Sequence, residues 1–241
     1  MNNINEYNLS IKYLSVILIV LWSMATACAQ AEREVDTVIV GDDTYQVEWK
    51  LRESFDEGWE DRWVLEGDSC YISVLDNKLY VNDYMGATIW NVEEYPANIL
   101  VRLKVIGLDR TDTKTNFNII THGRENDGSP LVIGPESGRT GAYKPYHDFP
   151  NHIATFVYKW TRVRRDPGFN LLSDVQEVAS KTNTEYEIVF AVNEERLIYY
   201  INGVKHHEVP NEHPLPGGKF GIRTWNTLAF WYDIEIGELI K

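Results

Sequence analysis

Residues 197–209 read Leu-Ile-Tyr-Tyr-Ile-Asn-Gly-Val-Lys-His-His-Glu-Val and hold the clearest fold signal in the chain. Asn202 and Gly203 stand between two β-rich runs, and an Asn-Gly pair favours a tight hairpin because both residues accept a positive φ. The segment therefore predicts two antiparallel strands joined by a two-residue turn. His206 and His207 follow this turn, and we predict that both are surface side chains.

Similar short runs, rich in Tyr, Val, Ile and Trp, recur from Thr37 onward, and almost none keeps a helical period. We expect strands at residues 37–40, 45–51, 71–75, 78–81, 99–105, 116–120, 187–192 and 196–201. Short strands separated by turn residues at regular intervals indicate a sandwich or a barrel. We predict an all-β chain that forms one antiparallel β-sandwich domain over residues 30–241.

Residues 1–29 have the pattern of a secretory signal. Lys12 precedes an apolar run from Tyr13 to Trp22, and small residues follow as far as Ala29. The chain is cleaved after an Ala-x-Ala, or it is lipidated at Cys28, since Ala25-Thr26-Ala27-Cys28 resembles a lipobox; an uncleaved anchor is a lesser alternative. We predict an extracytoplasmic protein, in the periplasm of a bacterium or attached to its outer membrane through Cys28.

The composition limits how such a domain is stabilised and what it binds. Beyond the predicted signal, Cys70 is the single cysteine, so a disulfide framework is excluded and a hydrophobic core must stabilise the fold. The 241 residues carry a net charge of -13. Because nucleic-acid-binding proteins show a basic footprint, this balance argues against a nucleic-acid partner.

The charge reverses between residues 139 and 165. Six cations stand here against the one anion Asp148, a local charge of +5, and the cations are Arg139, Lys144, Lys159, Arg162, Arg164 and Arg165. If residues 153–164 form one extended strand, alternate side chains share a face, namely Phe156, Tyr158, Trp160, Arg162 and Arg164. Aromatic rings beside guanidinium groups suit a stacked sugar whose carboxylate or sulfate is bound by arginine. The alternative is a solvated face beside ordinary core aromatics.

Several motifs resemble those of concanavalin A-like lectin/glucanase jelly rolls. The opening strands of that superfamily are similar to Phe55-Asp56-Glu57-Gly58 with Trp59 and Trp63, and to residues 74–81. Its late hairpin and its final strands are similar to residues 198–204, 217–225 and 230–236. The resemblance covers residues 45–239 and implies a jelly roll. Secreted bacterial domains for polysaccharide breakdown are the most similar subgroup.

The catalytic motifs of that superfamily are absent from the sequence. The glucanase pattern Glu-x-Asp-x-x-Glu does not occur, since residues 233–238 carry carboxylates in the wrong order. The alginate-lyase patterns Tyr-Phe-Lys-Ala-Gly and Gln-x-His do not occur either. The residue types that β-elimination needs are nevertheless present: a base, an acid and a cation that neutralises the uronate.

We therefore predict candidate site residues in two groups. Histidines and tyrosines of the aromatic, cation-rich segment and of the run from Asn116 to Arg124 could serve as acid or base. Tyr143 is a candidate from the same loop, and the main candidates are His122, Tyr146, His147, His152 and Tyr158. Polar and aromatic residues that alternate along expected strands could bind the substrate: Asn118, Arg124, Lys159, Trp160, Arg162, Arg164, Arg223 and Trp225.

The sequence thus predicts a polysaccharide lyase that acts on an acidic, uronate-containing polysaccharide or oligosaccharide. The alternatives are a carbohydrate-binding jelly roll without catalysis and a glycoside hydrolase with unrecognised carboxylates. No cofactor is required for elimination, and no zinc site is specified. A structural calcium ion is possible, with oxygens from the acidic turns Asp42-Asp43 and Asp56-Glu57.

Overall fold

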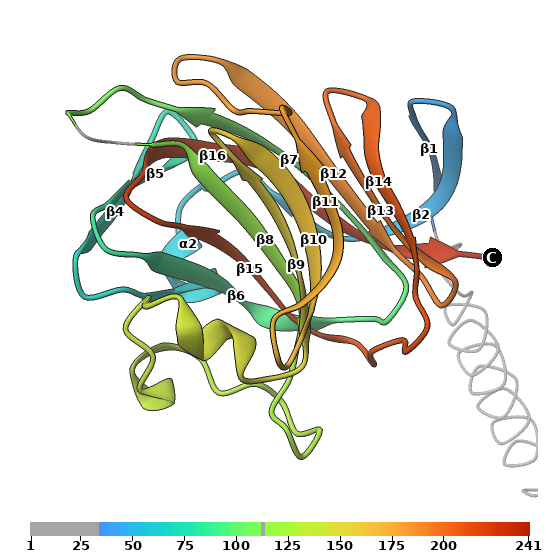
Figure 1. The fold of residues 1–241 in the computed structure, drawn as a ribbon. Coiled ribbons are helices and arrows are strands. Elements are labelled where there is room, and N and C mark those ends of the chain that lie inside the picture. The colour runs from blue at the N-terminus through green and yellow to red at the C-terminus, as the bar shows by residue number, and fades with distance from the viewer. Residues whose placement is uncertain (1–33, 112–113) are drawn as a thin grey trace, which may run out of the picture. The chain divides into compact units, whose positions relative to one another are not determined.

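The computed structural model describes residues 34–111 and 114–241. Sixteen strands of these residues form two antiparallel sheets (Figure 1). The first sheet has nine strands. Its main path runs through β1 (Asp36–Val40), β2 (Asp43–Glu53), β16 (Leu228–Ile240), β7 (Ile99–Gly107), β12 (Glu185–Val192), β13 (Arg196–Ile201) and β14 (Val204–Pro210), and β5 (Lys78–Asp83) joins β16 to β4 (Cys70–Leu75).

The second sheet has seven strands. In order these are β11 (Asn170–Gln176), β10 (Trp160–Asp166), β9 (Asn151–Val157), β8 (Asn116–Gly123), β15 (Gly218–Thr224), β6 (Ala87–Tyr95) and β3 (Trp63–Glu66). Short helices lie between strands: α2 (Trp59–Arg62), η1 (Gly134–Ser137) and η2 (Lys144–His147). Residues 35–241 form one compact unit, and the predicted signal at residues 1–29 lies outside the described residues.

The main core lies between the two sheets. Alternate side chains of β7, among them Val101, Leu103 and Val105, are buried in the same cluster as Phe117 and Ile119 of β8. Trp231 of β16 meets Phe117 edge to face, with ring centroids 5.6 Å apart. Burial of each such side chain contributes about 1.5–3 kcal/mol, so this apolar layer supplies the stability for which no disulfide is available.

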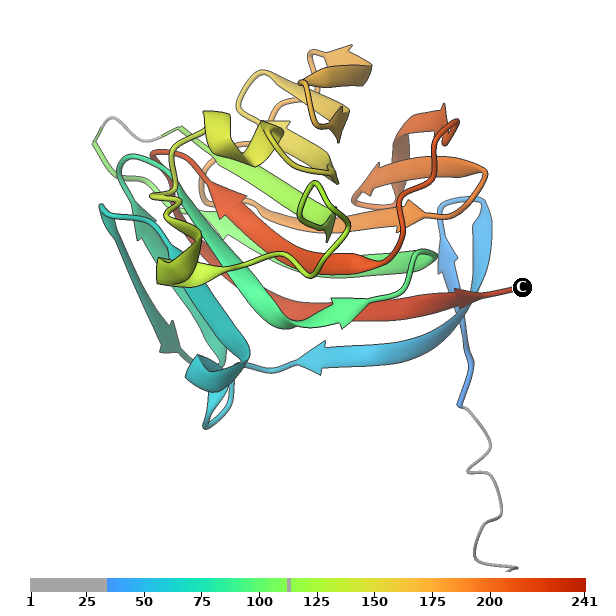
Figure 2. The ribbon, with the colours of Figure 1, turned by 90° about the horizontal axis from the view of Figure 1, so that it is seen from below.

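A second apolar cluster lies on the opposite face of the seven-stranded sheet. Trp90 of β6, Ile120 of β8 and Ile153 of β9 point outward there, because their chain neighbours point into the main core. The long connection from β8 to β9 covers them with Leu131, Tyr146 and Phe149. Figure 2 shows this connection, with η1 and η2, on the side of the sheet that faces away from β2 and β16.

His207 joins the edges of the two sheets, which corrects the prediction that it is a surface residue. It lies in β14 and is buried. Its Nδ1 is 2.8 Å from the hydroxyl of Ser173 in β11, and its Nε2 contacts the hydroxyl of Thr161 in β10. The sequence pattern did not reveal this because burial here depends on a second sheet that curls over the hairpin.

The predicted all-β sandwich is confirmed, and each of the eight expected runs overlaps an observed strand. The single strand expected over residues 153–164 is wrong. The chain turns at Tyr158 and Lys159, and β10 returns antiparallel to β9 with Thr161 opposite Phe156. Phe156 therefore lies in the main core, and Tyr158 stands at the turn rather than beside Trp160. In the parts of the chain that the structure describes, no helix is long and apolar enough to cross a membrane.

Candidate functional site

A groove of about 310 Å³ lies on the outer face of the seven-stranded sheet, beyond the edge of the second apolar cluster. Its lining combines aromatic rings, guanidinium groups, amides and a hydroxyl, and no carboxylate of the described residues lines it. The lining residues are Asn116, Asn118, Tyr143, Thr155, Trp160, Arg162, Arg164, Arg223 and Trp225. Six of the eight predicted substrate-binding residues are among them.

The floor of the groove is one row of side chains that crosses the strands. Arg162 of β10 pairs with Thr155 of β9, which pairs with Asn118 of β8, which pairs in turn with Arg223 of β15. Residues directly opposite each other in neighbouring strands project from the same face of a sheet, so these four side chains adjoin. Thr155 Oγ1 donates to Asn118 Oδ1 at 2.8 Å, and Asn118 Nδ2 donates to the backbone oxygen of Arg223 at 3.2 Å.

Arg223 is a buried cation without a carboxylate partner among the described residues. Its exposed fraction is 2%, and its Nη2 donates to the backbone oxygen of Gly141 at 2.9 Å. The guanidinium carbon is 5.5 Å from the ring centroid of Tyr143 and 5.1 Å from that of Tyr146. Nε has no hydrogen-bond partner within the described part of the chain. Burial lowers the pKa of Arg223, as expected where the charged form loses water without gaining an anion.

The aromatic walls of the groove differ in what covers them. Trp225 and Tyr143 have exposed fractions of 45% and 47%. Trp160 instead carries the guanidinium of Arg162 at 3.7 Å from its ring, and Arg162 also pairs with Asp174 at 3.0 Å. A ligand ring can therefore stack on Trp225. On Trp160, the face that the Arg162 guanidinium covers is not open to a ligand ring. The Arg164 side chain has no ion pair or hydrogen bond with any described residue, and its guanidinium carbon lies 5.9 Å from the ring centroid of Trp160.

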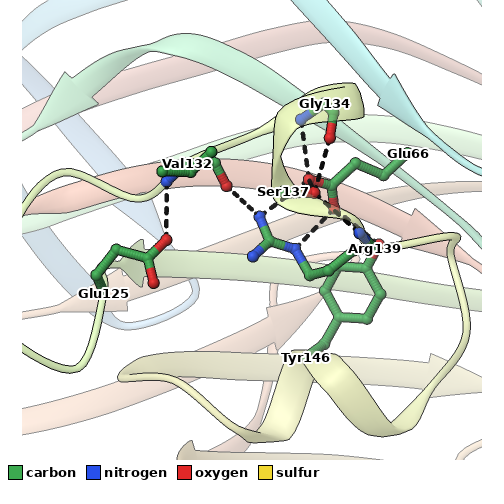
Figure 3. A network of polar contacts seen from close by, with 7 residues as sticks. All are labelled: Glu66, Glu125, Val132, Gly134, Ser137, Arg139 and Tyr146. Atoms are coloured by element: carbon green, nitrogen blue, oxygen red, sulfur yellow. Dashed lines mark hydrogen bonds and ion pairs between the residues drawn. The ribbon is translucent and has the colours of Figure 1, made fainter.

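A buried carboxylate, Glu66 at the end of β3, holds the loop that closes one side of the groove (Figure 3). Arg139 donates to both of its oxygens, at 2.9 and 3.0 Å. The backbone N–H of Gly134 and the hydroxyls of Ser137 and Tyr146 donate to it as well, at 2.8 to 2.9 Å. These five bonds join β3 to η1 and η2, and they fix the Tyr146 ring against Arg223.

Two glycines set the distance between this loop and the sheet. Gly141 has φ 81°, and a Cβ there would lie 2.0 Å from the backbone oxygen of Gly86. Gly86 has φ 111° and is held by its N–H, which donates to Asp83 Oδ1 at 2.7 Å. Only glycine permits this approach, because any side chain would collide with the facing backbone. The approach brings the Gly141 oxygen within hydrogen-bond distance of Arg223.

The predicted catalytic histidines do not line the groove. His122 and His152 are buried against each other, with ring centroids 5.1 Å apart, and His122 contacts the backbone oxygen of Ala97 at 2.9 Å. His122 has φ 62°, which ends the alternation of β8 and turns its side chain away from the face of Asn116 and Asn118. Burial lowers the pKa of His122 to about 4 and that of His152 well below its usual value.

His147 and Tyr146 are also buried behind the groove. The Nδ1 of His147 is 2.9 Å from Asp166, and its ring stacks on Phe169 with centroids 3.8 Å apart. The ring also lies against Tyr143, the lining tyrosine, with centroids 4.4 Å apart. Burial raises the pKa of Tyr146. Both residues therefore support the wall of the groove and have no direct access to a ligand.

Three further predicted residues lie elsewhere. Arg124 donates to the backbone oxygens of Gly217 and Gly128 and pairs with Glu94 at 2.9 Å, so it links loops at the opposite end of β8. Tyr158 and Lys159 stand at the turn between β9 and β10, where the Lys159 ammonium lies 5.3 Å from the Tyr158 ring. None of the three lines the groove.

Sequence reasoning missed Thr155, Glu66 and Asp174. Thr155 and Asp174 join the row only because of the register of β9 and β11 against β10. Glu66 carries no local signal, because its partners lie 68 or more residues further along the chain. Tertiary pairing rather than any motif assigns these roles.

The acidic turns predicted to supply calcium ligands have protein partners. Asp43 pairs with Lys205 at 2.9 Å, and Asp56 pairs with Arg62 at 2.7 Å. Among residues 34–111 and 114–241, no group of three or more His, Cys, Asp or Glu side chains is arranged to hold a metal ion. The calcium prediction gains no support from the described side chains.

Comparison with solved structures identifies the fold. A Bacillus subtilis protein of unknown function with a galectin-like fold aligns with a TM-score of 0.71 and 18% identity, over 86% of this chain and all of that one. The carbohydrate-binding module CBM66 of B. subtilis has a TM-score of 0.55, 8% identity and coverage of 73% and 95%. The Ca²⁺- and Man₃GlcNAc-bound exoplasmic/lumenal domain of VIP36 has a TM-score of 0.58, 10% identity and coverage of 80% and 91%.

The predicted concanavalin A-like jelly roll is confirmed by these likenesses. At such low identities they establish the fold alone. No protein-family model matches the chain, and no curated protein matches it either.

The Glu66 network leads to a stability prediction. Glu66→Gln should lower the free energy of unfolding by about 3–5 kcal/mol, because it leaves the nearly buried Arg139 without its counter-charge. Urea unfolding followed by tryptophan fluorescence measures this loss. Glu125→Gln is the control, since Glu125 accepts one bond from the backbone of Val132 near the surface, and its loss should be about 1 kcal/mol or less. Equal losses in the two variants would contradict the assignment.

The buried histidines lead to a prediction on pH. The pKa values of His122 and His207 are lowered to about 4, so the folded state binds fewer protons than the unfolded state below the usual value of 6.5. Stability should therefore fall as the pH decreases from 6.5 towards 4, by up to about 1.4 kcal/mol per pH unit for each histidine. Urea midpoints measured across this range should fall less steeply for His122→Gln. The exposed His213→Gln should reproduce the wild-type slope.

Proposed function

We propose that this protein is an extracytoplasmic glycan-binding jelly roll whose groove takes an acidic polysaccharide or oligosaccharide. One juxtaposition carries the proposal: the exposed ring of Trp225 stands in the same groove as the buried, carboxylate-free guanidinium of Arg223. A sugar stacked on an aromatic ring, with its carboxylate on an arginine, satisfies both groups at once. A buried cation is costly unless it is paired, so a bound anion would recover part of that cost.

The similar folds lend support to a glycan ligand. One neighbour is described as a carbohydrate-binding module, and another is described in a mannose-containing glycan complex. The VIP36 domain is exoplasmic or lumenal, which agrees with the extracytoplasmic location proposed from residues 1–29. Lipid attachment through Cys28 stays part of the proposal, and Cys28 lies outside the described residues. A structural calcium ion also stays part of the proposal, and the Ca²⁺-bound VIP36 domain is a precedent for it.

Binding is tested with a panel of uronate-containing glycans by affinity gel electrophoresis and calorimetry. Trp225→Ala should weaken binding about tenfold or more because it removes the exposed platform. Arg223→Gln should weaken it about 100-fold, since it removes the buried charge that meets the ligand anion. Exposed groups of the nine-stranded sheet provide the matched controls Tyr71→Ala and Arg52→Gln. Unchanged affinity in both groove variants would place the ligand elsewhere.

β-Elimination is a second candidate function, and one observation favours it. Tyr143 is a tyrosine exposed in the groove, next to the Arg223 guanidinium that would neutralise a uronate. In elimination a base removes the proton from C5, the bond from C4 to the glycosidic oxygen breaks, a C4=C5 double bond forms, and the leaving oxygen takes up a proton. A retaining or inverting hydrolase would instead need two carboxyl groups, and no carboxyl group of the described residues lines the groove.

Elimination is tested by the unsaturated uronide that it produces, because this product absorbs ultraviolet light whereas bound or hydrolysed glycans do not. If the protein is a lyase, the absorbance rises on incubation with a polymer of the panel. Tyr143→Phe should then lower the rate about 100-fold or more at unchanged binding. The turn variant Tyr158→Phe is the control and should keep the rate. Binding without any rise in absorbance would leave the binding function as the conclusion.

A further inference from the structure

We propose that Asp174 is a specificity-determining residue, which makes the groove select glycans whose acidic sugars are separated by neutral ones. The inference rests on the proposed function, since it concerns the ligand of the same groove. Its basis is the order of charges along the row of side chains that crosses the seven-stranded sheet. Asp174 of β11 pairs with Arg162 of β10 in this row, next to the groove-lining residues.

The two arginines of the row are far apart, and the positions between them are uncharged. Three strand spacings separate β10 from β15 in the order β10, β9, β8 and β15. At about 4.8 Å per strand, Arg162 and Arg223 therefore stand about 14 Å apart along the row. Thr155 and Asn118 fill the interval with a hydroxyl and an amide. A carboxylate placed there would lose water without gaining a cation.

Asp174 cancels one of these two charges. It lies 3.0 Å from Arg162, and Gln176 holds it in place by donating to its other oxygen at 2.7 Å. The same Arg162 guanidinium is stacked on Trp160, so its position is fixed by a ring and a carboxylate together. The cations without a carboxylate partner in the described part of the groove are Arg223 at one end and Arg164 at the other.

Arg164 stands one row further along β10, opposite Ile153 of β9. The groove therefore presents one available positive charge near each end and an uncharged middle, with the neutral Arg162–Asp174 pair beside β10. A glycan with an acid on every sugar would place carboxylates over the uncharged middle and over this pair, where Asp174 already occupies Arg162. A glycan with neutral sugars between its acidic ones avoids both costs.

The test uses two galacturonate hexamers with one backbone: the fully acidic hexamer and a hexamer in which only the first and fourth carboxyl groups are free and the others are methyl esters. Calorimetry at fixed salt should show that the wild-type protein binds the partly esterified hexamer about tenfold more tightly, although that hexamer carries fewer charges. In Asp174→Asn the fully acidic hexamer should bind about tenfold more tightly than it binds the wild type, and the preference should disappear.

Asp56→Asn is the matched control. It also removes an aspartate that is paired with an arginine, and so it changes the net charge equally, but the partner of Asp56 is Arg62, which does not line the groove, whereas the partner of Asp174 is the lining residue Arg162. It should keep the wild-type preference, which separates a local effect of Asp174 from a general effect of net charge. Thermal unfolding of each variant shows that the fold is retained.

The other outcomes overturn the inference. It is wrong if the wild-type protein binds the fully acidic hexamer as tightly as the esterified one, or if Asp174→Asn leaves the ratio unchanged. It is equally wrong if neither hexamer binds but another glycan does, and if Trp225→Ala weakens the binding of that glycan. In that case the proposed glycan-binding function still holds. Failure of every glycan in the panel to bind would instead refute the proposed function itself.

Discussion

The buried carboxylate of Glu66 is the interaction on which the rest of the site depends. It accepts five hydrogen bonds, and its ion pair is with Arg139 rather than with Arg223. Glu66 pairs with Thr88, and Thr88 pairs with Arg223, so the carboxylate and the groove arginine stand in the same row, two strands apart. Because Arg139 neutralises Glu66, Arg223 keeps its charge available for a ligand.

Tyr146 connects these two buried charges. Its hydroxyl donates to Glu66 at 2.9 Å, and its ring lies 5.1 Å from the guanidinium of Arg223. A buried ion pair contributes little net stability, since desolvation offsets its attraction. The Glu66–Arg139 pair instead determines position, because it holds the long connection between β8 and β9 against the sheet. Because the connection is held in this way, Tyr143 and the backbone oxygen of Gly141 are positioned as one wall of the groove.

The packing that forms the groove also buries three of the predicted catalytic histidines, so they do not line it. His147 is enclosed by Asp166, Phe169 and Tyr143, and His122 and His152 are enclosed by each other. Histidine acts as an acid or a base only where it can reach the reacting group and exchange protons near neutral pH. These histidines therefore support the architecture, and Tyr143 is the proposed acid–base candidate that lines the groove among the described residues.

The sequence by itself determined the sandwich and part of the site. Alternating β-rich runs and turn residues such as Asn202-Gly203 are local signals, because strand and turn preferences depend on neighbouring residues in the chain. Arg162, Arg164, Arg223 and Trp225 could be selected as ligand contacts because cations beside aromatic rings are unusual in so acidic a chain.

Only the tertiary structure decided which of the candidates meet. The turn at Tyr158 moved two predicted contacts out of the groove, and the positive φ of His122 turned that side chain away from it. Thr155, Asp174 and Glu66 entered the site through register and through contacts across many residues of sequence. Strand register and long-range ion pairs depend on the packing of whole sheets, which no local run of residues encodes.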